Sequence, residues 1–118
     1  MLGVRRGFAR APEDQPVPQA FPDRIQSLPP FEGPFDAVRL QAQDCEVLFA
    51  SYPAATEIPT HSHETRNCGV ITRGELVLIT DQSEQRFVPG EWYSLAPGLK
   101  HAARFEVDTS EVEFWFRL

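Results

Sequence analysis

Cysteine and long apolar runs are both scarce in this sequence. Of its 118 residues only two are cysteine, Cys45 and Cys68, which are too few for a disulfide framework and form no CxxC pair. No apolar run approaches the ~18 residues that a membrane-spanning helix requires. The arginine pair near the N-terminus is not followed by the apolar stretch of a signal peptide. We therefore expect a cytoplasmic protein with reduced thiols and no membrane partner.

Basic residues are also in the minority. The chain has 11 Lys and Arg against 17 Asp and Glu, and its formal net charge is -6. Surfaces that neutralise nucleic-acid phosphates or anionic lipid headgroups need clustered Lys and Arg. This charge balance argues against a nucleic-acid partner, and we expect a small-molecule substrate or ligand instead.

Proline, in contrast, is abundant in the first part of the chain. Residues 1–34 contain most of the 11 prolines. Proline lacks the N–H that a β-ladder needs, and it restricts the residue before it. This composition predicts an extended or irregular leader over residues 1–34. Apolar side chains of this region could dock on the rest of the chain or on a partner subunit; they are Phe21, Ile25, Leu28, Phe31 and Phe35.

Residues 35–118 have the pattern of a single β domain. Short alternating runs such as "AVRLQ", "CEVLFASY", "ELVLITD" and "HAARFEV" are separated by turn residues. Strands of this length and spacing are typical of an antiparallel sandwich or barrel. No window of useful length has helical periodicity, and the length suffices for one hydrophobic core. We expect an all-β, single-domain barrel.

The last run, "EVEFWFRL", predicts a strand with two different faces. Val112, Phe114 and Phe116 share one face because the side chains of a strand alternate with a period of two. We expect this face to lie in the core. Trp115 is on the opposite face, where it would cover the leader or a dimer contact.

The three histidines are the strongest indication of a binding site. His61 and His63 are separated by one residue in "PTHSHETRNCGVITRG", and His101 ends "GEWYSLAPGLKH". In a strand, side chains at i and i+2 point to the same face with Cα atoms about 6.6 Å apart, so His61 and His63 can converge on one ion. A turn at residues 64–66 would let Asn67 face back toward them. Taken alone, such a pair is also typical of a half-exposed polar strand edge.

These two segments resemble the two motifs of the cupin family, G-x5-H-x-H-x3,4-E-x6-G and G-x5-P-x-G-x2-H-x3-N. Both align without a gap, and the resemblance covers about residues 37–116. The matching positions are His61, His63, Gly74, Gly90, Gly98 and His101. The departing positions are Ala55 for the first glycine, Asn67 for the glutamate, Ala96 for the proline and Phe105 for the asparagine. The resemblance implies a jelly-roll barrel, or double-stranded β-helix, with a metal ion held by the three histidines.

The replacement of the glutamate by Asn67 affects the charge of such a site. Three neutral imidazoles leave a divalent ion with its full charge and with open positions, as in catalytic metal sites. A site of this kind favours anionic ligands such as a thiolate, an enolate or a carboxylate. We expect Asn67 to orient the ligand or a water molecule, and Glu64 is an alternative ligand. Imidazole suits several divalent transition metals; the resemblance favours Fe(II), with Zn, Ni or Mn as alternatives.

Three functional hypotheses follow. The three-histidine pattern is similar to that of cupin dioxygenases acting on thiols or diketones, so the leading hypothesis is a metal-dependent dioxygenase with a small anionic organic substrate. One alternative is a non-catalytic, metal-bearing cupin that binds or senses a small ligand. The other is a cupin isomerase or lyase with Glu57 or Glu64 as its base. Pairing of two copies would bury both the barrel edge and the apolar leader, so we expect a homodimer.

Overall fold

The computed structural model describes residues 21–81 and 83–117, so most of the predicted leader lies outside the described residues. In chain order the elements are α1 (Asp23–Gln26), β1 (Asp36–Gln41), β2 (Cys45–Tyr52), β3 (Thr56–His61), β4 (Arg66–Arg73), β5 (Leu76–Thr80), β6 (Ser83–Phe87), β7 (Trp92–Leu95), β8 (His101–Phe105) and β9 (Thr109–Phe116). Helix α1 is a single turn. Within the described ranges, no helix has the length and apolar character needed to cross a membrane.

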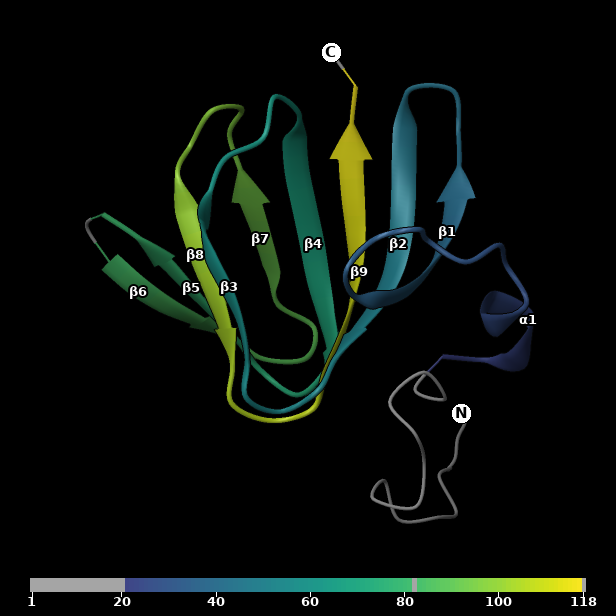
Figure 1. Cartoon of the computed structure of the whole chain (residues 1–118), viewed down its shortest axis with the longest axis horizontal. Helices are drawn as coiled ribbons and strands as arrows, with labels where there is room; N and C mark the ends of the chain where they lie inside the picture. The colour runs from purple at the N-terminus through teal and green to yellow at the C-terminus, as the bar shows by residue number, and fades with distance from the viewer. Residues whose placement is uncertain (1–20, 82, 118) are drawn as a thin grey trace.

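The strands form two antiparallel sheets that face each other across the core (Figure 1). One sheet has five strands in the order β1-β2-β9-β4-β7, and the other has four strands in the order β3-β8-β5-β6. Strand β9 therefore lies between β2 and β4, which are distant from it in the sequence. This arrangement is a jelly roll, and it confirms the predicted all-β barrel.

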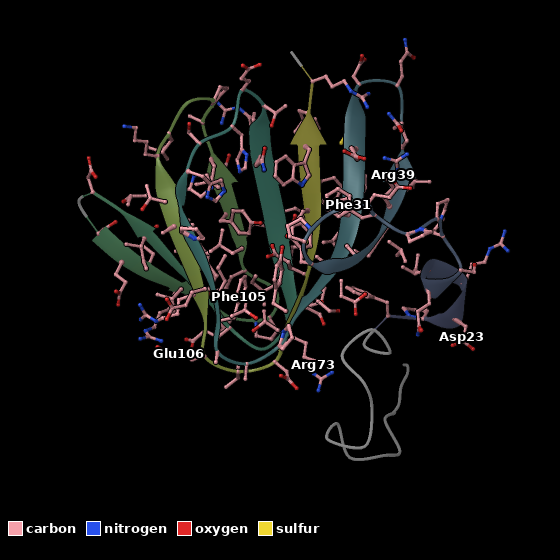
Figure 2. All side chains as sticks on the ribbon, viewed as in Figure 1. Asp23, Phe31, Arg39, Arg73, Phe105 and Glu106 are labelled. Carbon is pink, nitrogen blue, oxygen red and sulfur yellow. The ribbon has the colours of Figure 1, made fainter. Side chains whose placement is uncertain are left out.

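The hydrophobic core lies between the two sheets. In β2, for example, Leu48, Ala50 and Tyr52 alternate with side chains that point outward, as the period of a strand requires. Figure 2 shows Phe105 in the space between the sheets, where its ring stacks on Tyr52 with 4.1 Å between centroids. The buried members of the core are Ala37, Ala50, Tyr52, Ile71, Leu76, Leu78, Leu95, Ala103 and Phe105.

The described end of the leader packs on the barrel. Phe21 is buried, and its ring meets that of Phe49 edge-on at 5.7 Å between centroids. Phe31 stacks on Phe35, and Phe35 in turn packs on Tyr52 at 5.2 Å. Of the two options left open by the sequence, docking on the domain or on a partner subunit, the structure shows the first for these three phenylalanines.

The predicted facing of β9 is wrong. Trp115 lines a cavity inside the barrel. Val112, Phe114 and Phe116 lie on the outer face of the five-stranded sheet, where Phe114 stacks on the exposed Trp92. The alternation of a strand determines which residues share a face, but it does not determine which face is inside. Here the outer face is also apolar, so the usual pattern of apolar-in and polar-out does not apply.

Candidate metal centre

The structure brings the three histidines together at one point. His61 is the last residue of β3 and pairs in register with His101, the first residue of β8. One ring nitrogen from each of His61, His63 and His101 lies within 4.8 Å of the others. The Nε2 atoms of His61 and His63 are 3.1 Å apart. The three side chains thus form a group that could hold a metal ion.

His63 reaches this group from a loop and not from the predicted strand. Strand β3 ends at His61, and its pairing with β8 is irregular between Ile58 and His61. Pro59 lies within this irregular stretch and cannot donate a hydrogen bond to the ladder. The carbonyl oxygen of His63 instead accepts a hydrogen bond of 2.7 Å from the N–H of Gly98.

Gly98 connects the two halves of the site. Its φ is +82°, a left-handed conformation that glycine adopts without steric cost. This turn places the N–H of Gly98 against the loop of His63 and leads the chain into His101. The predicted role of Gly98 in a tight turn is confirmed.

Backbone carbonyls orient two of the imidazole rings. Nδ1 of His61 lies 2.8 Å from the carbonyl oxygen of Pro59, and Nδ1 of His101 lies 2.9 Å from that of Leu99. A carbonyl can only accept, so in the neutral ring the proton is on Nδ1 and the lone pair is on Nε2. Hydrogen bonds of this kind commonly support histidines that bind metals.

The local electrostatics favour the neutral form of the His63 and His101 imidazoles. Burial lowers the pKa of His63 to about 4, and positive charge on His61 or His101 would lower it in the same direction. Burial also lowers the pKa of His101. Neutral imidazole is the form that coordinates a metal, so this set of donors fits a divalent transition metal.

A cavity of about 450 Å³ extends from the histidines into the barrel. Its walls are mostly apolar, and the apolar and aromatic side chains that line it include Phe35, Ile58, Leu76, Leu78, Leu95, Ala103 and Phe105. A largely apolar cavity with a few convergent polar groups is the usual form of a small-molecule site.

Two buried glutamates on β9 lie in the same cavity, and the sequence analysis missed both. Glu111 and Glu113 are 2% and 4% exposed. The hydroxyl of Tyr93 donates a hydrogen bond of 2.6 Å to Glu111. Glu113 accepts hydrogen bonds from the hydroxyl of Tyr52 and from Nε1 of Trp115. The only signal in the sequence was the spacing of two glutamates and a tryptophan on alternate positions of one strand.

The two carboxyl groups interact directly and titrate as a pair. Burial and the negative charge of Glu113 raise the pKa of Glu111 well above its usual value. Burial also raises the pKa of Glu113, although hydrogen bonds from Tyr52, Glu111 and Trp115 act in the opposite direction. The pair therefore keeps one proton above the pH at which an exposed carboxyl loses it; Glu111 carries this proton and Glu113 accepts its hydrogen bond.

The remaining polar residues predicted for the site occupy different positions. Asn67 is 5% exposed and lines the cavity, and its Oδ1 accepts a hydrogen bond from the hydroxyl of Thr65. Glu57 also lines the cavity, whereas Glu64 is exposed in the loop between β3 and β4. Cys68 points to the outer face, as its position next to Asn67 predicts, with its thiol near Ser94.

Comparison with known proteins supports the fold. No family model matches this sequence, and no curated protein matches it. An RmlC-like cupin from Shewanella frigidimarina matches with a TM-score of 0.66 and 13% identity, over 75% of this chain and 80% of that chain. The DMSP lyase DddQ from Ruegeria pomeroyi matches with a TM-score of 0.63 and 20% identity, over 70% of this chain and 46% of that chain.

A third solved structure is a sugar phosphate isomerase of the cupin superfamily from Silicibacter pomeroyi. It matches with a TM-score of 0.59 and 21% identity, over 70% of this chain and 59% of that chain. At sequence identities this low, structural similarity shows a shared fold but does not show a shared activity. The part of the chain that the structure describes, residues 21–81 and 83–117, has the cupin fold.

Proposed function

We propose that this protein is a metal-dependent enzyme in which His61, His63 and His101 hold a divalent transition metal and a small anionic organic molecule binds beside it. The observation that carries the proposal is the convergence of three imidazole nitrogens at a cavity of about 450 Å³. Three protein ligands leave coordination positions open for a substrate, as in catalytic metal sites.

The bound metal would supply Lewis acidity and would attract an anionic group of the substrate. The donor set suits iron, zinc, nickel or manganese, because imidazole is a ligand for all of them. Asn67 would orient the substrate or a water molecule, since its amide group is buried and lines the cavity. The apolar walls would hold the carbon skeleton of the substrate and exclude water from it.

The reaction that the cavity favours is a proton transfer, as in an isomerase or a lyase. Glu111 and Glu113 place an acid and an acceptor of protons inside the cavity, and such groups are the usual agents of general acid–base catalysis. The names of the lyase and the isomerase with the same fold are consistent with this reaction class. From the sequence, a dioxygenase was favoured because the three-histidine pattern is similar to that of cupin dioxygenases, and only Glu57 and Glu64 were considered as a base.

The dioxygenase remains the second candidate, and the ligand set favours it. With Asn67 at the position of the motif glutamate, the ion would keep its full divalent charge. Iron in such a site could bring an anionic substrate and O₂ together. This candidate requires consumption of O₂, which a proton transfer does not.

Incubation of the protein with candidate substrates in D₂O separates the two reaction classes. Samples reconstituted with Fe(II), Zn, Ni or Mn would be screened against small hydroxy acids, keto acids, thiols and diketones. Deuterium incorporation detected by NMR without O₂ uptake would support the proton transfer, and O₂ uptake would support the dioxygenase. Loss of either signal in a His101→Ala variant would connect it to the metal centre. Absence of both signals with every metal would contradict the proposed enzyme.

A further inference from the structure

The carboxyl pair is costly for the fold, which suggests that it has a function. A buried carboxylate without partners is strongly unfavourable, and apolar residues of similar volume are often as stable as a buried ionic group. Glu111 and Glu113 nevertheless lie inside the barrel, at positions where neighbouring strands contribute apolar side chains. Three donors from three strands stabilise them; they are Tyr52 of β2, Tyr93 of β7 and Trp115 of β9.

The hydrogen bonds give the two carboxyl groups different roles. Glu113 accepts from Tyr52 and Trp115, and these donors stabilise its negative charge. Glu111 accepts from Tyr93 and interacts directly with Glu113. Because the charge of one buried carboxylate disfavours ionisation of the other when the two interact directly, the pair holds one proton above the usual carboxyl pKa. The pair therefore contains a proton acceptor and a proton donor side by side.

The strand register places this pair close to the histidines. Trp115 lies beside Asn67 in the sheet, and its ring meets the ring of His63 at 4.5 Å between centroids. Glu113 is two residues before Trp115 in β9, which corresponds to about 6.8 Å along an antiparallel strand. A molecule of a few carbon atoms bound at the histidines would therefore extend to Glu113.

Asn67 provides an independent indication that this space holds a ligand. The side chain is 5% exposed and lines the cavity. Its Oδ1 accepts from Thr65, whereas its amide nitrogen has no hydrogen-bond partner among the described residues. Buried donors are nearly always satisfied, so a ligand or water oxygen in the cavity is the natural partner.

We propose that Glu113 is the base and Glu111 the acid of a proton-transfer site that acts on the substrate bound at the histidines. This inference rests on the proposed function for the orientation of the substrate. A C–H bond of the substrate breaks, its proton moves to a carboxylate oxygen of Glu113, and the electron pair stays on the substrate. The proton held by Glu111 then completes the reaction in one of two ways. It is added to another carbon in an isomerisation, or it protonates a leaving group, which departs with the electrons of its own bond to carbon while the C–H pair forms a double bond. No oxidant or reductant is needed.

The test uses glycidol, a small neutral epoxide, as the probe. A carboxylate oxygen of Glu113 would form a bond to an epoxide carbon, the epoxide C–O bond would break, and the proton of Glu111 would neutralise the resulting alkoxide. Glycidol would be incubated with the full-length protein, and peptide mass spectrometry would locate the ester. We expect the ester on Glu113. Because general acid catalysis typically contributes 10² or more, Glu111→Gln should slow its formation by about 100-fold.

Matched variants and metal analysis separate the outcomes. Glu84→Gln changes an exposed carboxyl on β6, outside the cavity, so the ester on Glu113 should form at the wild-type rate. An ester found on Glu57, or only on surface carboxylates, would overturn the proposal. Circular dichroism would check that the variants fold. Metal content, measured on the same samples, tests the histidine centre separately, because the reaction with glycidol does not require a metal. An ester on Glu113 without bound metal would support the carboxyl site alone. Bound metal without an ester would support the histidine metal centre alone.

Discussion

At the scale of single residues, Ala55 replaces the first glycine of the cupin motif, and this replacement costs the protein stability. Its φ is 73°, which is the left-handed region that favours glycine. For other residues this conformation costs roughly 1–2 kcal/mol. We expect Ala55→Gly to raise the free energy of unfolding by about 1 kcal/mol, measured by urea denaturation. Ala54→Gly, next to it, is the control and should not stabilise the protein; an equal gain in both variants would contradict this account.

The carboxyl pair should make stability depend on pH. Burial holds the pKa of Glu111 well above its usual value of 4.5, so above that pH the unfolded chain loses a proton that the folded chain keeps. The stability that Glu111 contributes is therefore complete at acidic pH and decreases as the pH rises toward the folded pKa. Glu111→Gln removes this term, and from about pH 5 to about pH 8 its melting temperature should fall less steeply than that of the wild type.

Glu64→Gln provides the control for this experiment, because it removes an exposed carboxyl from the loop between β3 and β4. Its melting temperature should follow the wild-type dependence on pH. Equal slopes for the wild type and Glu111→Gln would mean that the pair does not hold its proton in the folded state. The groups that face the pair and could modify the slope are Tyr52, Tyr93, Glu57, His61, His63 and His101.

The sequence predicted the histidines and not the glutamates, for a physical reason. His61, His63 and His101 occur at fixed spacings, which backbone geometry converts into proximity once the strands are known. The burial of Glu111 and Glu113 depends instead on hydroxyl donors from Tyr52 and Tyr93, which are distant in the sequence. No local pattern contains this information, so only the tertiary structure shows it.

At the scale of elements, β9 shows the limit of hydrophobic alternation. Shifting the facing of a strand by one residue exchanges its two faces. The apolar residues Val112 and Phe114 were assigned to the core by their hydrophobicity, but they lie on a second, partly covered apolar surface. The rule fails for a strand whose outer face also packs against other side chains.

The pairing of β4 with β7 depends on one glycine. Gly69 lies opposite Tyr93, and a Cβ atom at this position would overlap the Tyr93 ring. The absence of a side chain lets the ring lie over the strand, so that its hydroxyl reaches Glu111. We expect Gly69→Ala to destabilise the protein by about 1–3 kcal/mol, as overpacked sites do, measured by urea denaturation.

Two further variants test this explanation. In the double variant Gly69→Ala with Tyr93→Ala, the overlap is absent. The double variant should therefore lose less stability than the sum of the losses in the two single variants. Cys68→Ala changes the adjacent residue on the outer face and should cost less than Gly69→Ala. Strict additivity of the Gly69 and Tyr93 substitutions would contradict the packing explanation.

At the scale of the whole molecule, the residues that the structure describes leave the outer surface of the five-stranded sheet incompletely covered. The strand register puts nine aliphatic and aromatic side chains on this outer apolar face; they are Val38, Leu40, Val47, Phe49, Val70, Trp92, Val112, Phe114 and Phe116. Phe21 covers part of it at Phe49, whereas Trp92 is 58% exposed. Contiguous apolar surfaces of this kind commonly mark contacts between proteins.

We propose that this face pairs with that of a second copy, whereas the sequence-based prediction of a homodimer relied on the barrel edge and the apolar leader. Trp92→Lys should shift the protein from dimer to monomer in sedimentation equilibrium, because it introduces a charge into the apolar contact. Val107→Lys changes another exposed apolar residue, located in the turn before β9, and should leave the dimer intact. A wild-type protein that is monomeric at all concentrations would contradict this prediction.

The overall architecture was predictable because it depends on features that are repeated along the chain. Short alternating runs and turn residues indicated the barrel, and two spaced motifs indicated its type. The docking of Phe21 and Phe31 was expected only as one of two options, because apolar side chains in a leader do not specify the surface that they cover. The position of His63 in a loop was not expected, since its spacing from His61 also fits a continuous strand.

The metal content of untagged protein tests the central claim most directly. Elemental analysis would compare the wild type with His63→Ala and with Ser62→Ala, which changes the exposed residue between the two histidines. The account predicts a near-stoichiometric divalent transition metal in the wild type and in Ser62→Ala, and its loss in His63→Ala. No metal in the wild type after reconstitution, or equal metal in wild type and His63→Ala, would contradict the metal centre.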